Sequence, residues 1–330
     1  MERVLVFLSH NEHRPRLGYW RANGRGLAND PCSWADAVAD IGSPLFVLDH
    51  DGETALGHGG SLDGNSHDAY PAWAYAGPCL PESLGDASFI ADCGLRYAYV
   101  AGAMANGIAS EDVVIAMGRA GMLSFFGAAG LPPRRVEQAI DTIQRALPHG
   151  PYGFNLIHSP NEASIEAEVA DLYIRRGIRL VEASAYLRLT LPIVKYRLHG
   201  IHRSADGRVE TLNRVIAKIS RVEVAEQFFS PAPEKLVQQL VDSGDLTPEQ
   251  ARLSREVPMA QDLSAEADSG GHTDNRPAIA LLPTMIALRD RLQAEFGYAE
   301  PLRVGLGGGI STPASAAAAG ERPPGSSPVA

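Results

Sequence analysis

Between residues 95 and 306, short apolar runs alternate with longer stretches in which apolar residues recur at helical spacing. Residues 132–147 illustrate the second kind, because Val136 and Ile140 lie one turn apart on the same face. We expect strands at 97–103, 122–127, 152–157, 179–185, 214–219, 263–267 and 302–306. Seven strand-and-helix units at this spacing predict an α/β fold. They favour a parallel (β/α) barrel of the TIM type over an open sheet.

The stretches between these strands predict helices. The helix expected at 110–120 begins with Ser110, whose hydroxyl can cap the first turn, and carries Glu111 and Asp112 where acidic groups are favourable. Further helices are expected at 132–147, 162–176, 191–198 and 278–295, with a helical region up to residue 256 that prolines interrupt.

The first 84 residues do not follow this pattern. They are rich in glycine, proline and aromatic residues, and they predict a small, irregular N-terminal domain. Within it, the apolar run 44–49 followed by Asp51 and Gly52 predicts a strand that enters a tight turn. Met1–Leu8 also favours a strand over a signal peptide.

The end of the chain departs from the pattern as well. Residues 314–319 can begin a helix, but residues 320–330 are rich in proline, glycine and serine and predict a disordered tail. No eighth strand is predicted. We therefore expect the barrel to occupy residues 85–319 and to lack its eighth strand, and we favour truncation over replacement of the strand by N-terminal residues.

Composition narrows the classes of partner. The chain has a net charge of −10, which argues against nucleic acid as a partner. No apolar run is long enough to span a membrane, so we expect no membrane partner. Cys32, Cys79 and Cys93 show neither metal-ligand spacing nor a disulfide framework, so we expect a cytoplasmic protein.

Candidate chemistry lies at the carboxyl ends of the predicted strands, where α/β proteins place their sites. Glu266–Pro277 is a polar, glycine-containing turn between a strand and a helix, and its His272 can transfer a proton near neutral pH. Gly307–Gly309 can present backbone N–H groups to a phosphate, although an ordinary tight turn is the alternative. Lys218 and Asn155 lie near strand ends and can contact a ligand, or can be a surface lysine and a structural amide.

Several alternatives stay open at this point. His158 shares a strand end with Asn155, and Glu182 and Lys195 can either form structural ion pairs or line the mouth of the barrel. His272 has no second histidine nearby, so we predict no metal site. The chain contains no nucleophile elbow, P-loop, zinc-protease motif or early dinucleotide-binding fingerprint.

Four segments resemble one family closely: Tyr99–Ser110, Tyr152–Glu162, Val181–Tyr186 and Glu266–Pro277. They are similar to the PfaD-type enoyl reductases, which are stand-alone enzymes of trans-acyltransferase polyketide synthases and polyunsaturated fatty acid synthases. That family is in turn similar to nitronate monooxygenases and to flavin-dependent enoyl-acyl-carrier-protein reductases. The resemblance covers residues 85–319.

The resemblance implies an FMN-binding barrel that uses NADPH or NADH to reduce the α,β double bond of an enoyl thioester. It implies catalytic roles for His272 and Lys218, with His272 orienting the thioester carbonyl or relaying a proton and Lys218 stabilising negative charge on the reduced flavin. The cofactor-binding residues that it implies are Ala103, Met104, Asn155, Lys218, Gly270, Gly271, Gly307, Gly308 and Gly309.

The implied partners are an acyl carrier protein that bears the enoyl group and the polyketide or fatty acid synthase itself. A homodimer is a further open alternative, which the sequence does not decide. Ser311 stands where the family has a glycine in the phosphate turn. Measured against this family, the C-terminal lid of the barrel is missing as well as the eighth strand. The alternatives are a nitronate monooxygenase of the same fold and a truncated, non-catalytic docking partner of the synthase.

Overall fold

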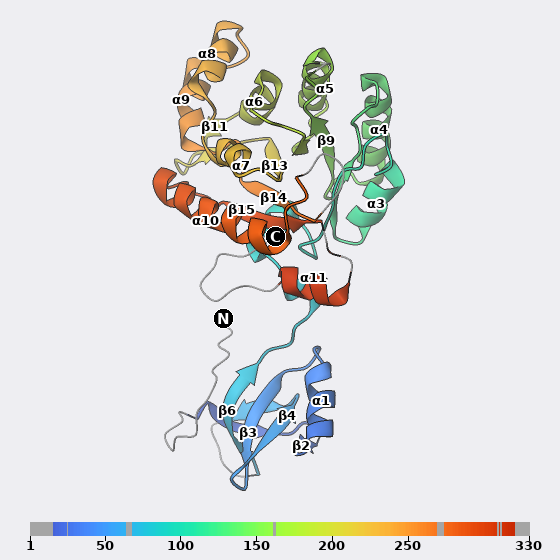
Figure 1. The fold of residues 1–330 in the computed structure, drawn as a ribbon, viewed down its shortest axis with the longest axis vertical. Coiled ribbons are helices and arrows are strands. Elements are labelled where there is room, and N and C mark those ends of the chain that lie inside the picture. The colour runs from blue at the N-terminus through green and yellow to red at the C-terminus, as the bar shows by residue number, and fades with distance from the viewer. Residues whose placement is uncertain are drawn as a thin grey trace. The chain divides into compact units, whose positions relative to one another are not determined.

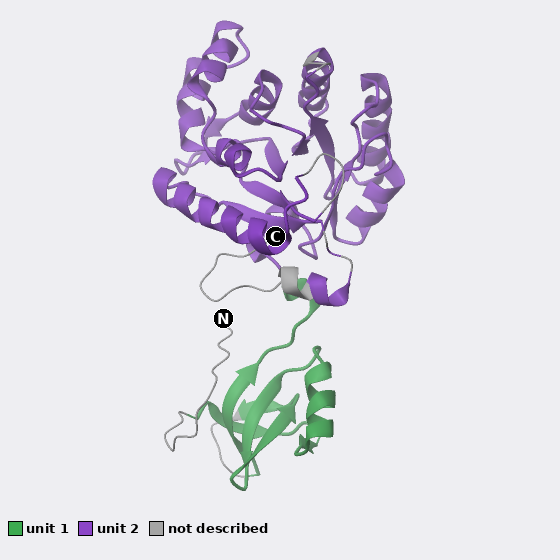
Figure 2. Cartoon of the chain, in the orientation of Figure 1, with its two compact units in different colours: residues 1–84 green, residues 85–330 purple. Residues whose placement is uncertain are grey.

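The computed structural model of the protein describes residues 16–24, 26–63, 68–160, 163–268, 274–308, 310 and 312–320. The chain divides into two compact units at Leu84, residues 1–84 and residues 85–330 (Figure 2). The strand expected at Met1–Leu8 and the tail from residue 321 lie outside the described residues, as does Ser311.

The described residues of the first unit form an antiparallel sheet of six strands and the helix α1 (Pro31–Ala39). The strand order is β2 (Leu27–Ala28), β4 (Glu53–His58), β3 (Leu45–His50), β6 (Tyr70–Ala76), β1 (Gly18–Arg21) and β5 (Ser61–Asp63). The expectation of an irregular domain was wrong here. The strands are short and interrupted by glycines, so the sequence shows little of the period-2 alternation that announces a sheet.

A buried tryptophan organises this sheet. Trp20 is fully buried, and its indole N–H donates to the Gly59 carbonyl at 2.7 Å. A Cβ at Gly57 would come within 2.7 Å of the Trp20 ring, so the strand needs glycine there. The turn predicted at Asp51 and Gly52 is confirmed: both residues have positive φ and join β3 to β4 as a two-residue hairpin.

The second unit contains a curled sheet of seven parallel strands (Figure 1). In spatial order they are β15 (Arg303–Gly307), β14 (Asp262–Glu266), β13 (Arg214–Ile219), β10 (Leu180–Ser184), β9 (Gly153–Ile157), β8 (Leu123–Phe126) and β7 (Val100–Ala101). Every predicted strand is present, and neighbours in space are neighbours along the chain apart from the small hairpin β11 (His202–Arg203) and β12 (Val209–Glu210). The barrel-type fold is therefore confirmed, and within the described residues no strand covers the outer edges of β7 and β15.

Helices surround the curled sheet (Figure 1). They are α2 (Ala87–Cys93), α3 (Glu111–Arg119), α4 (Pro133–Ala146), α5 (Ala163–Arg175), α6 (Leu191–Leu198), α7 (Val222–Phe229), α8 (Glu234–Asp242), α9 (Pro248–Leu253), α10 (Ala278–Phe296) and α11 (Pro313–Gly320). Single 3₁₀ turns occupy Pro81–Ser83 and Ser254–Glu256. The predicted helices agree to within about two residues, but α2 was not predicted.

The strands direct alternate residues to opposite faces. On β13, Val215 and Ala217 belong to the core between sheet and helices, whereas Ile216 packs in a separate cluster with Phe89 of α2. Lys218 has the same parity as Ile216, so it lies on the inner face of the curled sheet. The same alternation places one residue in two of every strand inside the barrel.

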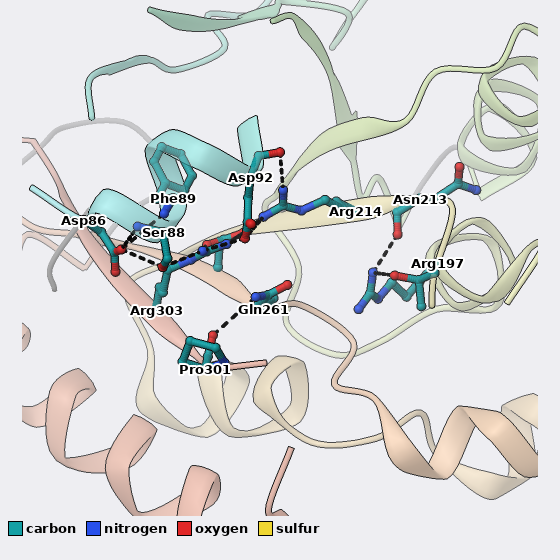
Figure 3. Close-up of polar contacts among 12 residues, drawn as sticks. Asp86, Ser88, Phe89, Asp92, Arg197, Asn213, Arg214, Gln261, Pro301 and Arg303 are labelled. Carbon is teal, nitrogen blue, oxygen red and sulfur yellow. Dashed lines mark hydrogen bonds and ion pairs between the residues drawn. The ribbon is translucent and has the colours of Figure 1, made fainter. Parts of the chain in front are cut away.

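An ion-pair network closes the amino-terminal end of the inner face (Figure 3). Arg303 is 1% exposed, and its guanidinium bonds to Asp262 at 2.6 Å and to Asp92 of α2 at 2.7 Å. It also donates to the Ser88 hydroxyl at 3.0 Å. Arg214 approaches the same Asp262 at 3.0 Å. Helix α2 therefore acts as a plug at the amino-terminal end of the barrel. A ligand site is accordingly expected at the opposite end, where the strands have their carboxyl ends.

Candidate active site

Four acidic, basic or amide side chains lie on the inner face of four adjacent strands, two of them at mid-strand and two near the carboxyl ends. They are Asn155 on β9, Glu182 on β10, Lys218 on β13 and Glu266 on β14. Asn155 and Glu182 are register partners across β9 and β10, which places them at the same height in the barrel. Asn155, Glu182 and Glu266 are buried, and Lys218 is half-buried. A parallel strand that carries a charged inner residue near its end is typical of a ligand site.

Glu182 has the most unusual environment of the four. Its carboxylate accepts the backbone N–H of Ala103 at 2.8 Å, so it anchors the connection that follows β7. Gly102 packs closely beside it, since a Cβ there would lie 3.1 Å from the carboxylate. Burial raises the pKa of Glu182, and the positive charge of Lys218 partly opposes that rise. Glu182 is therefore a carboxyl group that binds a proton more readily than an exposed one.

The raised pKa of Glu182 leads to a prediction about how the free energy of unfolding depends on pH. A group that holds its proton more tightly when folded stabilises the fold at low pH, and the stabilisation is lost as the pH rises through the folded-state pKa. We expect Glu182→Gln, which keeps the acceptor for Ala103, to become progressively more stable than the wild type as the pH rises above 4.5. Urea unfolding at pH 5 and pH 8 would measure this. A difference in unfolding free energy that is the same at both pH values would contradict it.

Lys218 and Glu266 form an ion pair inside the barrel, with Nζ 3.3 Å from Oε1. The lysine is directed to the interior and is not the snorkelling surface residue of the alternative interpretation. Its side chain is 17% exposed and that of Glu266 is 10% exposed, so the pair keeps enough open surface for a ligand to reach it. Glu266 begins the His272 segment, but its partnership with Lys218 could not be anticipated from the sequence.

Asn155 lies in the middle of β9 and not at its end as predicted. Its amide nitrogen donates to the Glu182 carbonyl at 3.1 Å and to the Ser184 hydroxyl at 2.8 Å. The amide nitrogen is thus committed to β10, and the amide oxygen is the atom that can accept a hydrogen bond from a ligand. Asn155 therefore has a structural role in addition to the predicted binding role.

The connection after β7 is held against the end of β8. A Cβ at Gly127 would fall 1.7 Å from the carbonyl oxygen of Met104, so only glycine allows this close approach. The N–H of Gly127 donates to Ala109, and its carbonyl accepts from Gly107, each at 2.9 Å. These contacts hold Met104 in place while it stays 47% exposed, so its side chain is available to cover a ligand ring.

The predicted phosphate turn begins where β15 ends. A Cβ at Gly307 would lie 2.7 Å from the Ser264 hydroxyl, which would have to move, and Gly308 has a φ of +87°, which favours glycine. Gly309 lies outside the described residues, as do Gly270, Gly271 and His272. The structure thus places the start of the turn at the rim of the barrel and leaves these four assignments as predictions.

The two ends of the His272 segment have structural tasks. Asp268 accepts the N–H of Ala278 at 2.9 Å, which caps α10, and its own N–H donates to the Arg276 carbonyl at 3.0 Å. Asp274 binds Arg221 at the start of α7, 3.1 Å away. These polar residues, which drew attention in the sequence, therefore fasten the segment to the neighbouring helices.

A second polar cluster lies in the connections after β9 and β10. The buried carboxylate of Glu166 on α5 contacts Nδ1 of His158 at 2.8 Å and accepts the hydroxyl of Tyr186 at 3.0 Å. Thr190 donates to the same carboxylate, and the His158 ring stacks on Tyr186. Burial, followed by the charge of Glu166, raises the pKa of Tyr186 well above its usual range. Sequence reasoning noted His158 but missed these partners, which come from later elements of the chain.

Lys195 is not part of either cluster. Its Nζ lies 2.8 Å from Asp171 and 2.9 Å from Asp245, so it links α6 to α5 and to the end of α8 in the helix layer. The open alternative for this residue is settled as a structural ion pair.

A cavity of about 420 Å³ opens beside Asn155. Its walls are the connection from β8 to α4, the end of β9 and the first turns of α5. The residues that line it are Ala128, Ala129, Gly130, Leu131, Pro132, Asn155, Leu156, Ile157, Ser159, Ile165, Glu166 and Val169. Of the predicted cofactor-binding residues that the structure describes, Asn155 alone contributes to this lining.

Comparison with known proteins connects this geometry to a family. No protein-family model matches the chain. Over 244 residues, 73% of this chain and 16% of the relative, it is 52% identical to a component of the polyunsaturated fatty acid synthase of Thraustochytrium sp.. It is 48% identical to the polyketide biosynthesis protein PksE of Bacillus subtilis over 72% of this chain and 31% of that protein.

The structure also matches a crystal structure, that of the enoyl reductase domain of MlnA from the macrolactin biosynthesis cluster of Bacillus amyloliquefaciens. The TM-score is 0.70 at 44% identity, over 73% of this chain and 54% of that chain. The chain belongs to the PfaD-type enoyl reductase family. The resemblance seen in the four sequence segments is thereby confirmed, and so is the α/β barrel-type fold.

This member of the PfaD-type family spans less than one third of the two curated relatives described, 16% and 31% of their lengths. Within the part of the chain that the structure describes, no helix is both long and apolar enough to cross a membrane. The same residues hold no group of three or more His, Cys, Asp and Glu side chains that could bind a metal ion.

Proposed function

We propose that the protein reduces the α,β double bond of enoyl thioesters carried on an acyl carrier protein, and that it acts in trans in a polyketide or polyunsaturated fatty acid synthase system. The observation that carries this proposal is the inward-facing Lys218, which lies near the end of β13 on the same inner face as Asn155, in a barrel related to an enoyl reductase domain at 44% identity. NADPH or NADH would be the reductant and FMN the bound cofactor.

The residues at the barrel rim fit FMN. Gly307 and Gly308 begin a turn without side chains beyond β15, which can bring backbone N–H groups close to a phosphate. Lys218 supplies a cation between that turn and Asn155, since β13 lies between β15 and β9 in the sheet. Met104 and Ala103 follow β7 on the other side. When bound, FMN would carry hydride from the nicotinamide to the β-carbon of the substrate.

The protein's own side chains would stabilise charge, position the cofactor site and supply the proton. Lys218 would stabilise negative charge at the cofactor's ring, at a point where Glu266 holds the ammonium in place. Glu182 would keep the β7 connection in position through the N–H of Ala103. We assign to His272 the orientation of the thioester carbonyl or the proton for the α-carbon, in line with the family resemblance.

The test is direct. Protein purified with FMN should show flavin absorbance and oxidise NADPH or NADH in the presence of a crotonyl thioester, in particular when the thioester is attached to an acyl carrier protein. Protein without flavin absorbance and without this turnover would refute the proposal. Oxygen consumption with a nitronate, without enoyl reduction, would instead identify a nitronate monooxygenase.

The substitution His272→Ala provides a second prediction. We expect turnover to fall by about 10²-fold or more, because a positioned acid or base contributes roughly that factor. Flavin absorbance should stay at the wild-type level, since the change removes a group proposed to face the substrate. An unchanged rate of NAD(P)H oxidation would remove His272 from the mechanism.

A further inference from the structure

The cavity beside Asn155 has the size and the walls of a ligand pocket. Its volume of about 420 Å³ falls within the range of small-molecule sites. Leu131, Ile157, Ile165 and Val169 contribute apolar side chains to it, from three separate elements. It lies where the open end of the barrel meets the connections after β8 and β9.

FMN, as proposed above, would not fill this cavity. The phosphate turn follows β15 at one edge of the sheet, whereas the cavity lies over β9, four strands away in the sheet order. Asn155 belongs to both the cavity and the proposed cofactor site. A ligand in the cavity would therefore adjoin the end of the cofactor site opposite the phosphate, where the reacting part of the substrate must come.

The charges of the wall favour a neutral, apolar ligand. Among the described residues that line the cavity, Glu166 is the ionisable one, and its carboxylate already contacts His158, Tyr186 and Thr190. Its hydrogen-bonding capacity is thus largely used within the protein, and its charge would repel an anionic group. An alkyl chain requires no polar partner and gains from leaving water.

We propose that this cavity holds the acyl chain of the enoyl substrate, and that Val169 and Ile165 on α5 limit the length of chain that it accepts. The inference rests on the proposed function. The thioester end would lie at Asn155, and the chain would extend between Leu131 and α5.

A substitution that fills the cavity tests this. Val169→Phe should lower kcat/KM for an eight-carbon enoyl thioester by about tenfold or more, because pocket contacts to a few methylenes are worth at least that factor. Turnover of the four-carbon crotonyl thioester should change by less than about twofold. Val237→Phe on α8 is the matched control, since Val237 is 6% exposed and Val169 is 7% exposed, and it should leave the ratio of the two rates unchanged.

A second variant keeps the test decisive if Val169→Phe does not fold. Leu131 is partly buried at the cavity wall, and Leu131→Ala should shift the preference toward longer chains. If Val169→Phe and Leu131→Ala leave the ratio of eight-carbon to four-carbon rates at the wild-type value, the pocket assignment is overturned.

Measurements of ligand binding test the pocket assignment separately from the proposed reaction. Calorimetry with saturated acyl-pantetheine thioesters of four and eight carbons needs no turnover. If the wild type reduces no enoyl thioester but binds the longer chain more tightly, and Val169→Phe removes that difference, the pocket stands and the proposed reaction fails. If enoyl reduction occurs but neither binding nor rate depends on chain length, the reaction stands and the pocket is overturned.

Discussion

Replacing Arg303 by methionine should lower the free energy of unfolding of residues 85–330 by about 3–5 kcal/mol. Methionine fills much of the same volume, but it leaves the buried carboxylate of Asp262 and the carboxylate of Asp92 on α2 with Arg214 as their shared remaining partner in the network. The cost arises from a buried charge that has lost its bidentate partner, because the surrounding protein cannot solvate it as water does. The plug formed by α2 should loosen with it.

The chain offers an internal control for this measurement. Its three tryptophans, Trp20, Trp34 and Trp73, all lie within residues 1–84, so tryptophan fluorescence during urea unfolding reports the first unit. Far-ultraviolet circular dichroism is dominated by the helices, which lie mostly in the second unit. We expect Arg303→Met to shift the dichroism transition and to leave the fluorescence transition in place.

An exposed arginine supplies the matched substitution. Arg291 binds Glu226 at 2.7 Å, but the two side chains are about half exposed. Arg291→Met should therefore cost no more than about 1 kcal/mol, as exposed ion pairs do. A loss for Arg303→Met as small as that of Arg291→Met would show that the buried network does not stabilise the barrel.

Replacing Lys218 by methionine should reduce kcat for enoyl reduction by about 10²–10³-fold, the usual cost of removing one group that stabilises developing charge. The side chain stays long and apolar, so packing is largely kept while the cation is lost. The pKa of Glu182 should rise further in this variant, because the charge of Lys218 is what opposes the effect of burial. The measurement is steady-state oxidation of NAD(P)H with crotonyl thioester, at flavin contents matched by absorbance.

Two variants make this result specific. Lys218→Arg keeps a positive charge and should retain more activity than Lys218→Met, although the different shape of the guanidinium prevents full recovery. Lys195→Met removes a lysine whose ion pairs lie in the helix layer, and kcat should stay within about twofold of the wild type because the lost pairs are partly exposed. Equal losses for Lys218→Met and Lys195→Met would assign Lys218 a purely structural role.

Local pattern in the sequence predicted the elements of residues 85–330 well, whereas it missed most of the sheet of residues 1–84. All seven parallel strands and the helices that follow them could be placed, because a residue's tendency toward strand or helix depends on neighbours two to four positions away. The hairpin at Asp51 and Gly52 was predicted for the same reason. Helix α2 was missed, since it is seven residues long and shows less than two turns of the helical pattern.

The partners within the site required the tertiary structure. Glu182 anchors Ala103, 79 residues away, and Arg303 binds Asp92, 211 residues away. Alternation along a strand shows which residues share a face, but the height at which each residue lies in the barrel depends on the register between strands.

The sequence by itself thus determined the order of strands and helices in residues 85–330 and the family. Tertiary structure alone decided that Glu182 and Glu266 surround Lys218, that Glu166 draws His158 and Tyr186 together, and that a cavity opens beside Asn155. These features depend on residues brought together by strand register and helix packing, which no local segment of the chain contains.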